Sequence, residues 1–346
     1  MGIAIVTYLM YYKVRCIMLY KKPIQRKEVG SMFHIEEKYL YRNENNPIIK
    51  PADFPNAYAT FNCGQTMYKG KTILLVAIMM KTEPTPHIHV AESTDGVNFT
   101  IRPEPFIKRS SSEVIGPMDT WPIDPRVSYV PEDDMYYIIR PINSPWGCAA
   151  VLGRTKDFET YEEMDIVALP HNRVPSLFCG KVNGQYVRLD RPYDGRDEGR
   201  IWISFSDDLI HWGEYRPLLE QYTLWNWVKI GPTPPVKTKE GWFSLIHGVT
   251  TSCTGSKYCI GAMLQDLNDP RKVIGRTTTP ILFPNAPYEY MGTVPNVVFP
   301  CGFIANEDED SLRLYYGAAD TYIGLATGKL SEIIDLAKRE IKEYFP

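Results

Sequence analysis

The sequence predicts an all-β protein, a five-bladed β-propeller with a short C-terminal helix. Two observations favour this fold class: similar strands recur along the chain, and helical periodicity is confined to its last residues. Each recurring strand follows a turn-forming cluster, is aromatic or aliphatic, and ends on polar residues. The five copies are residues 70–76, 134–140, 184–191, 241–247 and 310–317.

A second pattern marks the units that contain these strands. After three of them another strand ends on Ser or Thr, with Asp two residues later and an aromatic residue four after that. The copies are Ser93, Asp95 and Phe99; Thr155, Asp157 and Tyr161; and Ser206, Asp208 and Trp212. Such units, about 50–70 residues long, are typical of propeller blades, because a ring of small sheets buries each sheet against the next. A β-sandwich with accidental similarity is the alternative.

Helical character is found at residues 329–344, where Ile333, Ile334, Leu336, Ala337 and Ile341 fall on one side. We expect this helix to pack outside the ring. Residues 32–346 are then one propeller domain, because repeat-built β folds accommodate this length in a single body.

The first 31 residues do not match the rest of the chain. Residues 3–20 are apolar, but two basic residues interrupt them and no small-residue cleavage site follows, so neither a membrane helix nor a secretory signal is predicted. Lys27-Glu28-Val29 can be encoded by a ribosome-binding sequence that precedes Met32. We therefore interpret residues 1–31 as a leader that is absent from the native protein, with a mobile interaction arm as the alternative.

Charge and cysteine content restrict the class of partner. Lys and Arg number 38 against 41 Asp and Glu, without long runs of one sign, which argues against nucleic acid or an anionic membrane. The 23 Tyr and 7 Trp suit β-strands and stacking on sugar rings. Seven scattered Cys without a Cys-x-x-Cys pair predict reduced thiols in the cytoplasm, with neither disulfides nor a metal site.

Polar residues at strand ends predict a pocket. In a propeller the innermost strand of each blade lines the central channel, so we expect the polar strand ends to converge there. The candidates are Asn62, Asp124, Arg191, His247 and Asp320. Asp124 lies between two prolines, which predict stiff, extended backbone before the next strand.

Ordered motifs from about residue 46 to the C-terminus resemble those of glycoside hydrolase family 130. They are Asp124-Pro125-Arg126; His171-Asn172-Arg173; Leu189-Asp190-Arg191-Pro192; Trp225-Asn226-Trp227 with Lys229-Ile230-Gly231; His247-Gly248-Val249; Val294-Pro295-Asn296-Val297-Val298-Phe299-Pro300; and Tyr315-Tyr316-Gly317-Ala318-Ala319-Asp320.

The resemblance implies a five-bladed propeller enzyme, a glycosyltransferase-type phosphorylase acting on β-mannosides. It implies inverting phosphorolysis of terminal β-mannosides to α-D-mannose 1-phosphate, with inorganic phosphate as co-substrate and no metal or organic cofactor. Asp124 is then the catalytic general acid. The implied phosphate-binding residues are Arg173, Arg191, His247, Tyr258 and Lys229, and the implied mannosyl-binding residues are Asn62 and Asp320. Arginine suits phosphate because its planar fork binds two oxygens and keeps its charge.

The chain departs from the family's pattern in two places. Phe178-Cys179-Gly180-Lys181 replaces a common Phe-Pro-Glu-Lys motif, and apolar Ile78-Met79-Met80 stands where many members have an arginine near the leaving sugar. The acceptor, the β-1,2 or β-1,4 linkage and homo-oligomerisation are left open. An inverting β-mannosidase that uses water, or a propeller that only binds mannosides, are the alternative functions.

Overall fold

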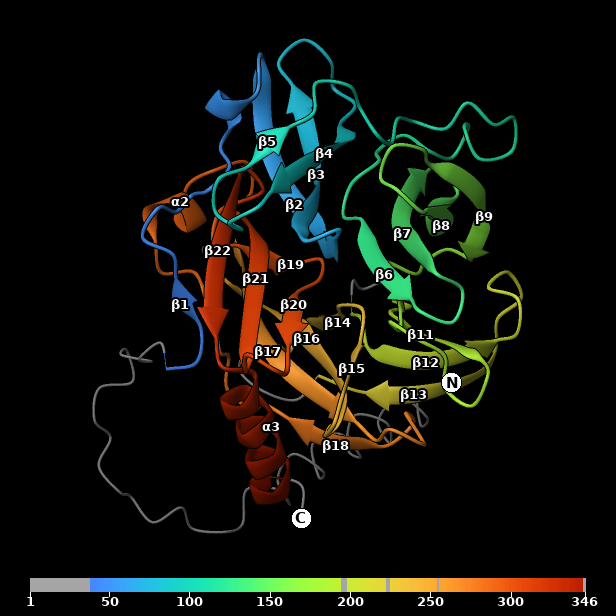
Figure 1. Cartoon of the computed structure of the whole chain (residues 1–346), viewed down its shortest axis with the longest axis vertical. Coiled ribbons are helices and arrows are strands. Elements are labelled where there is room, and N and C mark those ends of the chain that lie inside the picture. The colour runs from blue at the N-terminus through green and yellow to red at the C-terminus, as the bar shows by residue number, and fades with distance from the viewer. Residues whose placement is uncertain (1–37, 194–197, 222–224, 254, 345–346) are drawn as a thin grey trace, which may run out of the picture. The chain divides into compact units, whose positions relative to one another are not determined.

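The computed structural model describes residues 38–193, 198–221, 225–253 and 255–344. These residues form five antiparallel sheets and a C-terminal helix, and neighbouring sheets lie side by side around a centre (Figure 1). The predicted five-bladed propeller is therefore confirmed. The interpretation of residues 1–31 lies outside the described residues and stays a prediction.

Each of the first three blades is a meander of four strands in chain order. Blade one contains β2 (Ala57–Tyr68), β3 (Lys71–Met80), β4 (His87–Ser93) and β5 (Thr100–Ile101). Blade two contains β6 (Arg126–Val130), β7 (Met135–Ser144), β8 (Gly147–Thr155) and β9 (Glu162–Ala168). Blade three contains β10 (Ser176–Leu177), β11 (Tyr186–Asp190), β12 (Ile201–Ser206) and β13 (Gly213–Leu219).

The last two blades carry one additional short strand each. Blade four contains β14 (Lys229–Pro232), β16 (Gly241–Ser252), β17 (Gly255–Gln265) and β18 (Val273–Arg276), with β15 (Val236–Thr238) beside β16. Blade five contains β19 (Val298–Pro300), β21 (Ser311–Ala318), β22 (Tyr322–Gly328) and β1 (Tyr41–Arg42), with β20 (Ile304–Asn306) beside β21. Two short helices, η1 (Pro51–Asp53) and α2 (Pro287–Tyr290), lie in connections.

The recurring strands of the sequence are the second strands of the blades, not the innermost ones. They correspond to β3, β7, β11, β16 and β21, whereas the first strands are β2, β6, β10, β14 and β19. Several first strands have only two to five residues, too few to show a period-2 pattern. The second strands are nearly continuous apolar runs because each sheet packs on both faces, and residues 73–78 of β3 are all buried.

The recurring Ser/Thr-x-Asp pattern closes the third strand of a blade. In blade one, the Ser93 hydroxyl accepts a hydrogen bond from the main-chain NH of Gly96 at 2.8 Å. Asp95 accepts hydrogen bonds from the NH groups of Val97 and Asn98, both at 2.8 Å. Side chains thus satisfy main-chain donors in a tight turn, which returns the chain to the outer strand.

Blade five joins the two ends of the described chain. Strand β1 pairs with β22, and the side chain of Gln65 in blade one bonds the main chain of Tyr315 in both directions, at 2.8 and 2.9 Å. Helix α3 (Leu330–Tyr344) contacts β17 and β18 and buries Ile333, as predicted for a helix outside the ring. The ring is closed by pairing between residues far apart in the sequence.

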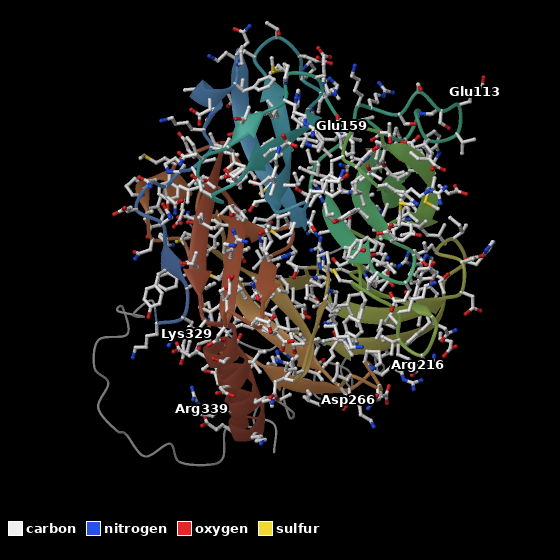
Figure 2. The ribbon with its side chains drawn as sticks, viewed as in Figure 1. Glu113, Glu159, Arg216, Asp266, Lys329 and Arg339 are labelled. Carbon is white, nitrogen blue, oxygen red and sulfur yellow. The ribbon has the colours of Figure 1, made fainter. Side chains whose placement is uncertain are left out.

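Charged side chains such as Glu159, Arg216 and Lys329 are exposed at the periphery (Figure 2). No helix among the described residues is long and apolar enough to cross a membrane.

Candidate active site

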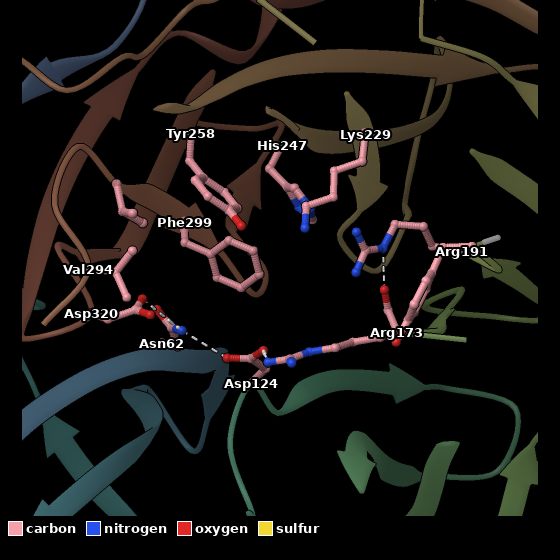
Figure 3. Close-up of a pocket in the computed structure, with 12 residues that line it drawn as sticks. Asn62, Asp124, Arg173, Arg191, Lys229, His247, Tyr258, Val294, Phe299 and Asp320 are labelled. Atoms are coloured by element: carbon pink, nitrogen blue, oxygen red, sulfur yellow. Dashed lines mark hydrogen bonds and ion pairs between the residues drawn. The ribbon is translucent and has the colours of Figure 1, made fainter. Parts of the chain in front are cut away.

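One pocket, with a volume of about 280 Å³, contains all eight candidate residues of the sequence analysis (Figure 3). They come from every blade: Asn62 from β2, Asp124 from two residues before β6, Arg173 from the connection before β10, Arg191 from the residue after β11, Lys229 from β14, His247 from β16, Tyr258 from β17 and Asp320 from the turn after β21. Asp124 and Lys229 lie at the starts of first strands and Arg191 and Asp320 at the ends of second strands, whereas Asn62 and His247 lie within longer strands. The roles of these residues stay predictions.

Asp124 is held through both its carboxylate oxygens. Asn62 Nδ2 donates to Oδ1 at 2.8 Å, and Arg173 Nη2 contacts Oδ2 at 3.0 Å. Arg126 Nη1 donates to the main-chain carbonyl of Asp124 at 3.1 Å. The carboxylate is 3% exposed, so it is almost completely enclosed and faces the pocket in a fixed direction.

The extended backbone predicted for Asp124 is wrong, because its φ is +50°. A following proline disfavours helical geometry, but here the bonds from Asn62, Arg173 and Arg126 prevail over that local preference. Asn62 and Asp320 also have positive φ, at +45° and +46°. Asn and Asp tolerate left-handed backbone better than most residues. A group of residues with left-handed backbone at one pocket is typical of functional sites.

Two glycines permit the close approach that this geometry requires. A Cβ at Gly64 would lie 2.8 Å from the carbonyl oxygen of Pro125, so only glycine lets β2 approach the residues around Asp124. A Cβ at Gly317 would collide with the side-chain oxygen of Asn62. Both contacts bring the Asn62 amide within reach of Asp124.

Asp320 lies beside Asp124 on what we call the carboxylate side of the pocket, made of Asn62, Asp124 and Asp320. Asn62 Nδ2 also donates to Asp320 Oδ1, at 3.4 Å, so one amide connects the two carboxylates. Burial, and secondarily the charge of Asp124, raise the pKa of Asp320 to about 6. Asn62 Oδ1 is buried without a hydrogen-bond partner among the described residues.

The opposite side, which we call the cationic side, consists of Arg191, Lys229, His247 and Tyr258. Arg191 Nε donates to the carbonyl of Arg173 (Figure 3). Burial, followed by repulsion from Arg173, lowers the pKa of Arg191 to about 10, so it stays charged at neutral pH. Burial and the neighbouring cations, Arg191 first among them, lower the pKa of His247 well below its ordinary value. His247 is therefore a neutral hydrogen-bonding group, and the charge comes from the arginines and Lys229.

Arg173 lies between the two sides. Burial is the largest single influence on its pKa and lowers it, but the charge of Asp124, the hydrogen bond to Asp124 and the smaller contributions of Cys148 and Tyr258 together raise it. Arg173 and Asp124 thus form an ion pair at the boundary between the carboxylate and cationic sides.

Four lining residues were missed by the sequence analysis as site residues: Tyr193, Val294, Val297 and Phe299. The Phe299 ring lies 4.8 Å from that of His247, and the guanidinium carbon of Arg126 lies 5.3 Å from the Phe299 ring. Phe299 is the aromatic residue of the Val294–Pro300 motif, and Tyr193 follows the Arg191-Pro192 motif. The position of these residues in or next to the family motifs could have indicated them. The local sequence, however, does not show which apolar residue of a motif faces the channel.

The described residues contain no group of three or more His, Cys, Asp or Glu side chains that could hold a metal ion. The pocket combines two carboxylates with several cations and has no cluster of soft or imidazole ligands. This composition fits an anion and a hydroxyl-rich ligand.

Comparisons with known proteins agree with this geometry. Residues 28–339 match the glycoside hydrolase family 130 described as β-1,4-mannooligosaccharide phosphorylase. The β-1,4-mannooligosaccharide phosphorylase of Ruminococcus albus is 32% identical over 307 residues, which cover 86% of this chain and 91% of that protein. The chain belongs to glycoside hydrolase family 130.

Two further findings concern family 130 proteins of Listeria innocua. A β-1,2-mannobiose phosphorylase of that organism is 38% identical over 261 residues, covering 74% of this chain and 70% of that protein. The solved structure of a Listeria innocua β-1,2-mannobiose phosphorylase with β-1,2-mannobiose superposes with a TM-score of 0.77 at 30% identity. It covers 87% of this chain and 99% of that chain.

The two departures from the family 130 pattern lie at different places. Met79 is half-buried and packs, with Trp121, against a cluster that includes Ile123, the residue before Asp124. Cys179 lines a second pocket, away from the predicted site residues. Only the change at Met79 therefore lies close to the acid.

Proposed function

We propose that this chain is an inverting phosphorylase that cleaves terminal β-mannosides with inorganic phosphate, releasing α-D-mannose 1-phosphate and a shortened acceptor. The observation that carries the proposal is the division of one pocket into a carboxylate side and a cationic side. An anionic nucleophile needs a cationic binding site and no base, whereas a leaving alcohol needs an acid.

The residues divide the work of such a reaction. Asn62 and Asp320 can form hydrogen bonds with mannosyl hydroxyls, and these bonds would orient the sugar beside Asp124. Arg173, Arg191 and Lys229, with His247 and Tyr258 as additional donors, can hold phosphate on the other side of the anomeric carbon. Asp124 then protonates the departing oxygen while phosphate forms the new bond with inverted configuration.

Hydrolysis is less compatible with this pocket. An inverting glycosidase needs a second carboxylate across the sugar ring from the acid, with room for a water between them. Here the second carboxylate, Asp320, lies on the same side as Asp124 and shares the amide of Asn62 with it. No Asp or Glu lines the cationic side of this pocket among the described residues.

The names of the similar proteins support the same substrate class: they are phosphorylases of β-1,4-mannooligosaccharide and of β-1,2-mannobiose. We also infer a cytoplasmic enzyme without metal or organic cofactor. The six cysteines in the described part of the chain are free, as expected for a reducing compartment.

The test is product analysis with and without phosphate. We expect unactivated β-mannosides to give mannose 1-phosphate only when phosphate is present, and reverse phosphorolysis on a panel of acceptors to identify the linkage. Release of free mannose at one rate with and without phosphate would establish a mannosidase instead.

A further inference from the structure

Arg173 is the point at which the acid and the phosphate site touch. Its guanidinium contacts Asp124 Oδ2 at 3.0 Å, and its main-chain carbonyl accepts a bond from Arg191. Arg191 makes no ion pair with a carboxylate within the described part of the chain. Of these two arginines, only Arg173 is therefore committed to Asp124.

This ion pair conflicts with the role of a general acid. A guanidinium at hydrogen-bond distance favours the ionised form of a carboxylate, and an ionised carboxylate has no proton to donate. Phosphate carries a larger charge than a carboxylate and would compete for the same guanidinium. One third of the Arg173 side chain is exposed to the pocket, so an incoming anion can reach it.

We propose that Arg173 couples phosphate binding to protonation of Asp124, so that the acid carries its proton only when the nucleophile is bound. The proposal rests on the function proposed above and adds a mechanism to it. Without phosphate, Arg173 holds Asp124 as the carboxylate. When phosphate engages Arg173, the carboxylate loses its partner, faces a second anion and takes one proton from solvent.

The proton balance closes over one turnover. Asp124 gives its proton to the glycosidic oxygen as the bond between this oxygen and the anomeric carbon breaks, and the acceptor leaves as an alcohol. A phosphate oxygen forms the new bond to the anomeric carbon, and hydrogen phosphate releases its own proton to solvent. When mannose 1-phosphate departs, Arg173 returns to the Asp124 carboxylate.

Few charged groups besides Arg173 influence the protonation of Asp124. The titratable and charged groups that face it are Arg173, Arg126, Asp320, Tyr258, Cys148 and Cys301. Burial raises the pKa of Tyr258, Cys148 and Cys301, so these three stay neutral near pH 7. Arg126 contacts the main chain of Asp124, and Asp320 repels its ionised form. Arg173 is thus the cation that directly stabilises the carboxylate.

The coupling explains why water would be a poor substitute for phosphate. A neutral nucleophile does not draw Arg173 away from Asp124, so the acid remains ionised and the leaving oxygen is not protonated. The pocket would discriminate against water as nucleophile because Asp124 stays ionised without phosphate. The absence of a base across the sugar ring is a second reason.

The experiment is calorimetric titration with inorganic phosphate at about pH 7 in two buffers of different ionisation enthalpy, which counts the protons taken up. We expect the wild type to take up about 0.5–1 proton more per phosphate than Asp124→Asn. The variant should also bind phosphate about 3- to 30-fold more tightly, because no carboxylate competes for Arg173.

Arg191→Met is the matched control, since it removes a phosphate contact without touching Asp124. It should bind phosphate more weakly yet keep the proton uptake, whereas Arg173→Met should lose both. Equal proton uptake and equal affinity in the wild type and Asp124→Asn would disprove the coupling and leave the phosphorylase intact. A wild type that binds no phosphate would overturn the proposed function itself.

Discussion

The two ends of the central channel are built from the same inner strands and differ in chemistry. One end is the candidate active site, where the inner strands begin. The other end is a second pocket of about 320 Å³, lined by later residues of the same strands, such as Gln65–Met67 of β2 and Val127 and Tyr129 of β6. The second pocket is the larger of the two, so size does not identify the site.

The difference lies in charge and backbone geometry. Lys237 is the one charged residue among those that line the second pocket, whereas the first contains two carboxylates, two arginines and a lysine. Three residues of the first pocket, Asn62, Asp124 and Asp320, have positive φ, and none of those lining the second does. The ring supplies two openings, and residues in unusual backbone conformations distinguish the candidate active site from the other opening.

The largest expected effect is that of Asp124→Asn. The amide keeps the shape of the carboxyl group but cannot donate the catalytic proton, so phosphorolysis of an unactivated mannoside should fall about 10²-fold or more. Turnover of the purified variant measures this, with circular dichroism as the control for folding. Near-normal turnover would show that Asp124 is not the acid, and the chemical difference between the two pockets would then no longer identify the active site.

The next effect concerns Arg191. Arg191→Ala deletes a charge-assisted phosphate contact and should raise the KM for phosphate about 10- to 100-fold, with a smaller change for the mannoside. Arg191→Lys should not rescue it fully. An ammonium group lacks the planar fork, and the burial and Arg173 charge that lower the pKa of Arg191 would push a lysine toward its neutral form. Unchanged phosphate kinetics in both variants would make Arg191 a structural residue.

Asp320→Asn tests the cost of placing two carboxylates together. Because the pKa of Asp320 is raised to about 6, ionisation in the folded state is disfavoured, and stability is lost as pH rises through this value. The amide removes that cost. We expect the variant to be more stable at pH 7.5 by roughly 1–3 kcal/mol, a few degrees in Tm, with no gain near pH 4. Mannoside turnover should fall. A Tm that moves equally at both pH values would contradict the assigned cause.

The smallest effect is expected at the second pocket. Lys237→Ala removes its charge and should change kcat and the KM for phosphate by less than about 2-fold, since Lys237 is exposed, lines the other pocket and is screened by salt. Steady-state kinetics at low salt give the most sensitive measurement. A loss comparable to that of Arg191→Ala would mean that the second opening also serves phosphate.

Local pattern was sufficient to predict the fold and to select five residues that lie in one pocket, whereas Arg173, Tyr258 and Lys229 were implied by the resemblance to family 130. Turn residues before apolar runs revealed the blades, and the polar residue at a strand end is a local feature, as at Arg191. The end predicted at His247 is wrong, because β16 continues to Ser252. The left-handed backbone of Asp124 was mispredicted because it depends on Asn62 and Arg173, 62 and 49 residues away. The ion pair of Arg173 with Asp124, and Phe299 beside His247, likewise depend on how separate blades meet.

The hydrogen bonds between Gln65 and Tyr315 have a consequence for how the enzyme is made. They join residues separated by 250 positions, and Asp320 lies five residues beyond the later partner. During synthesis, Asn62 and Asp124 leave the ribosome long before the residue that completes their pocket. The unfinished chain can form its early blades but has no assembled site, so catalytic competence arrives in one late step, when the final blade docks against the first.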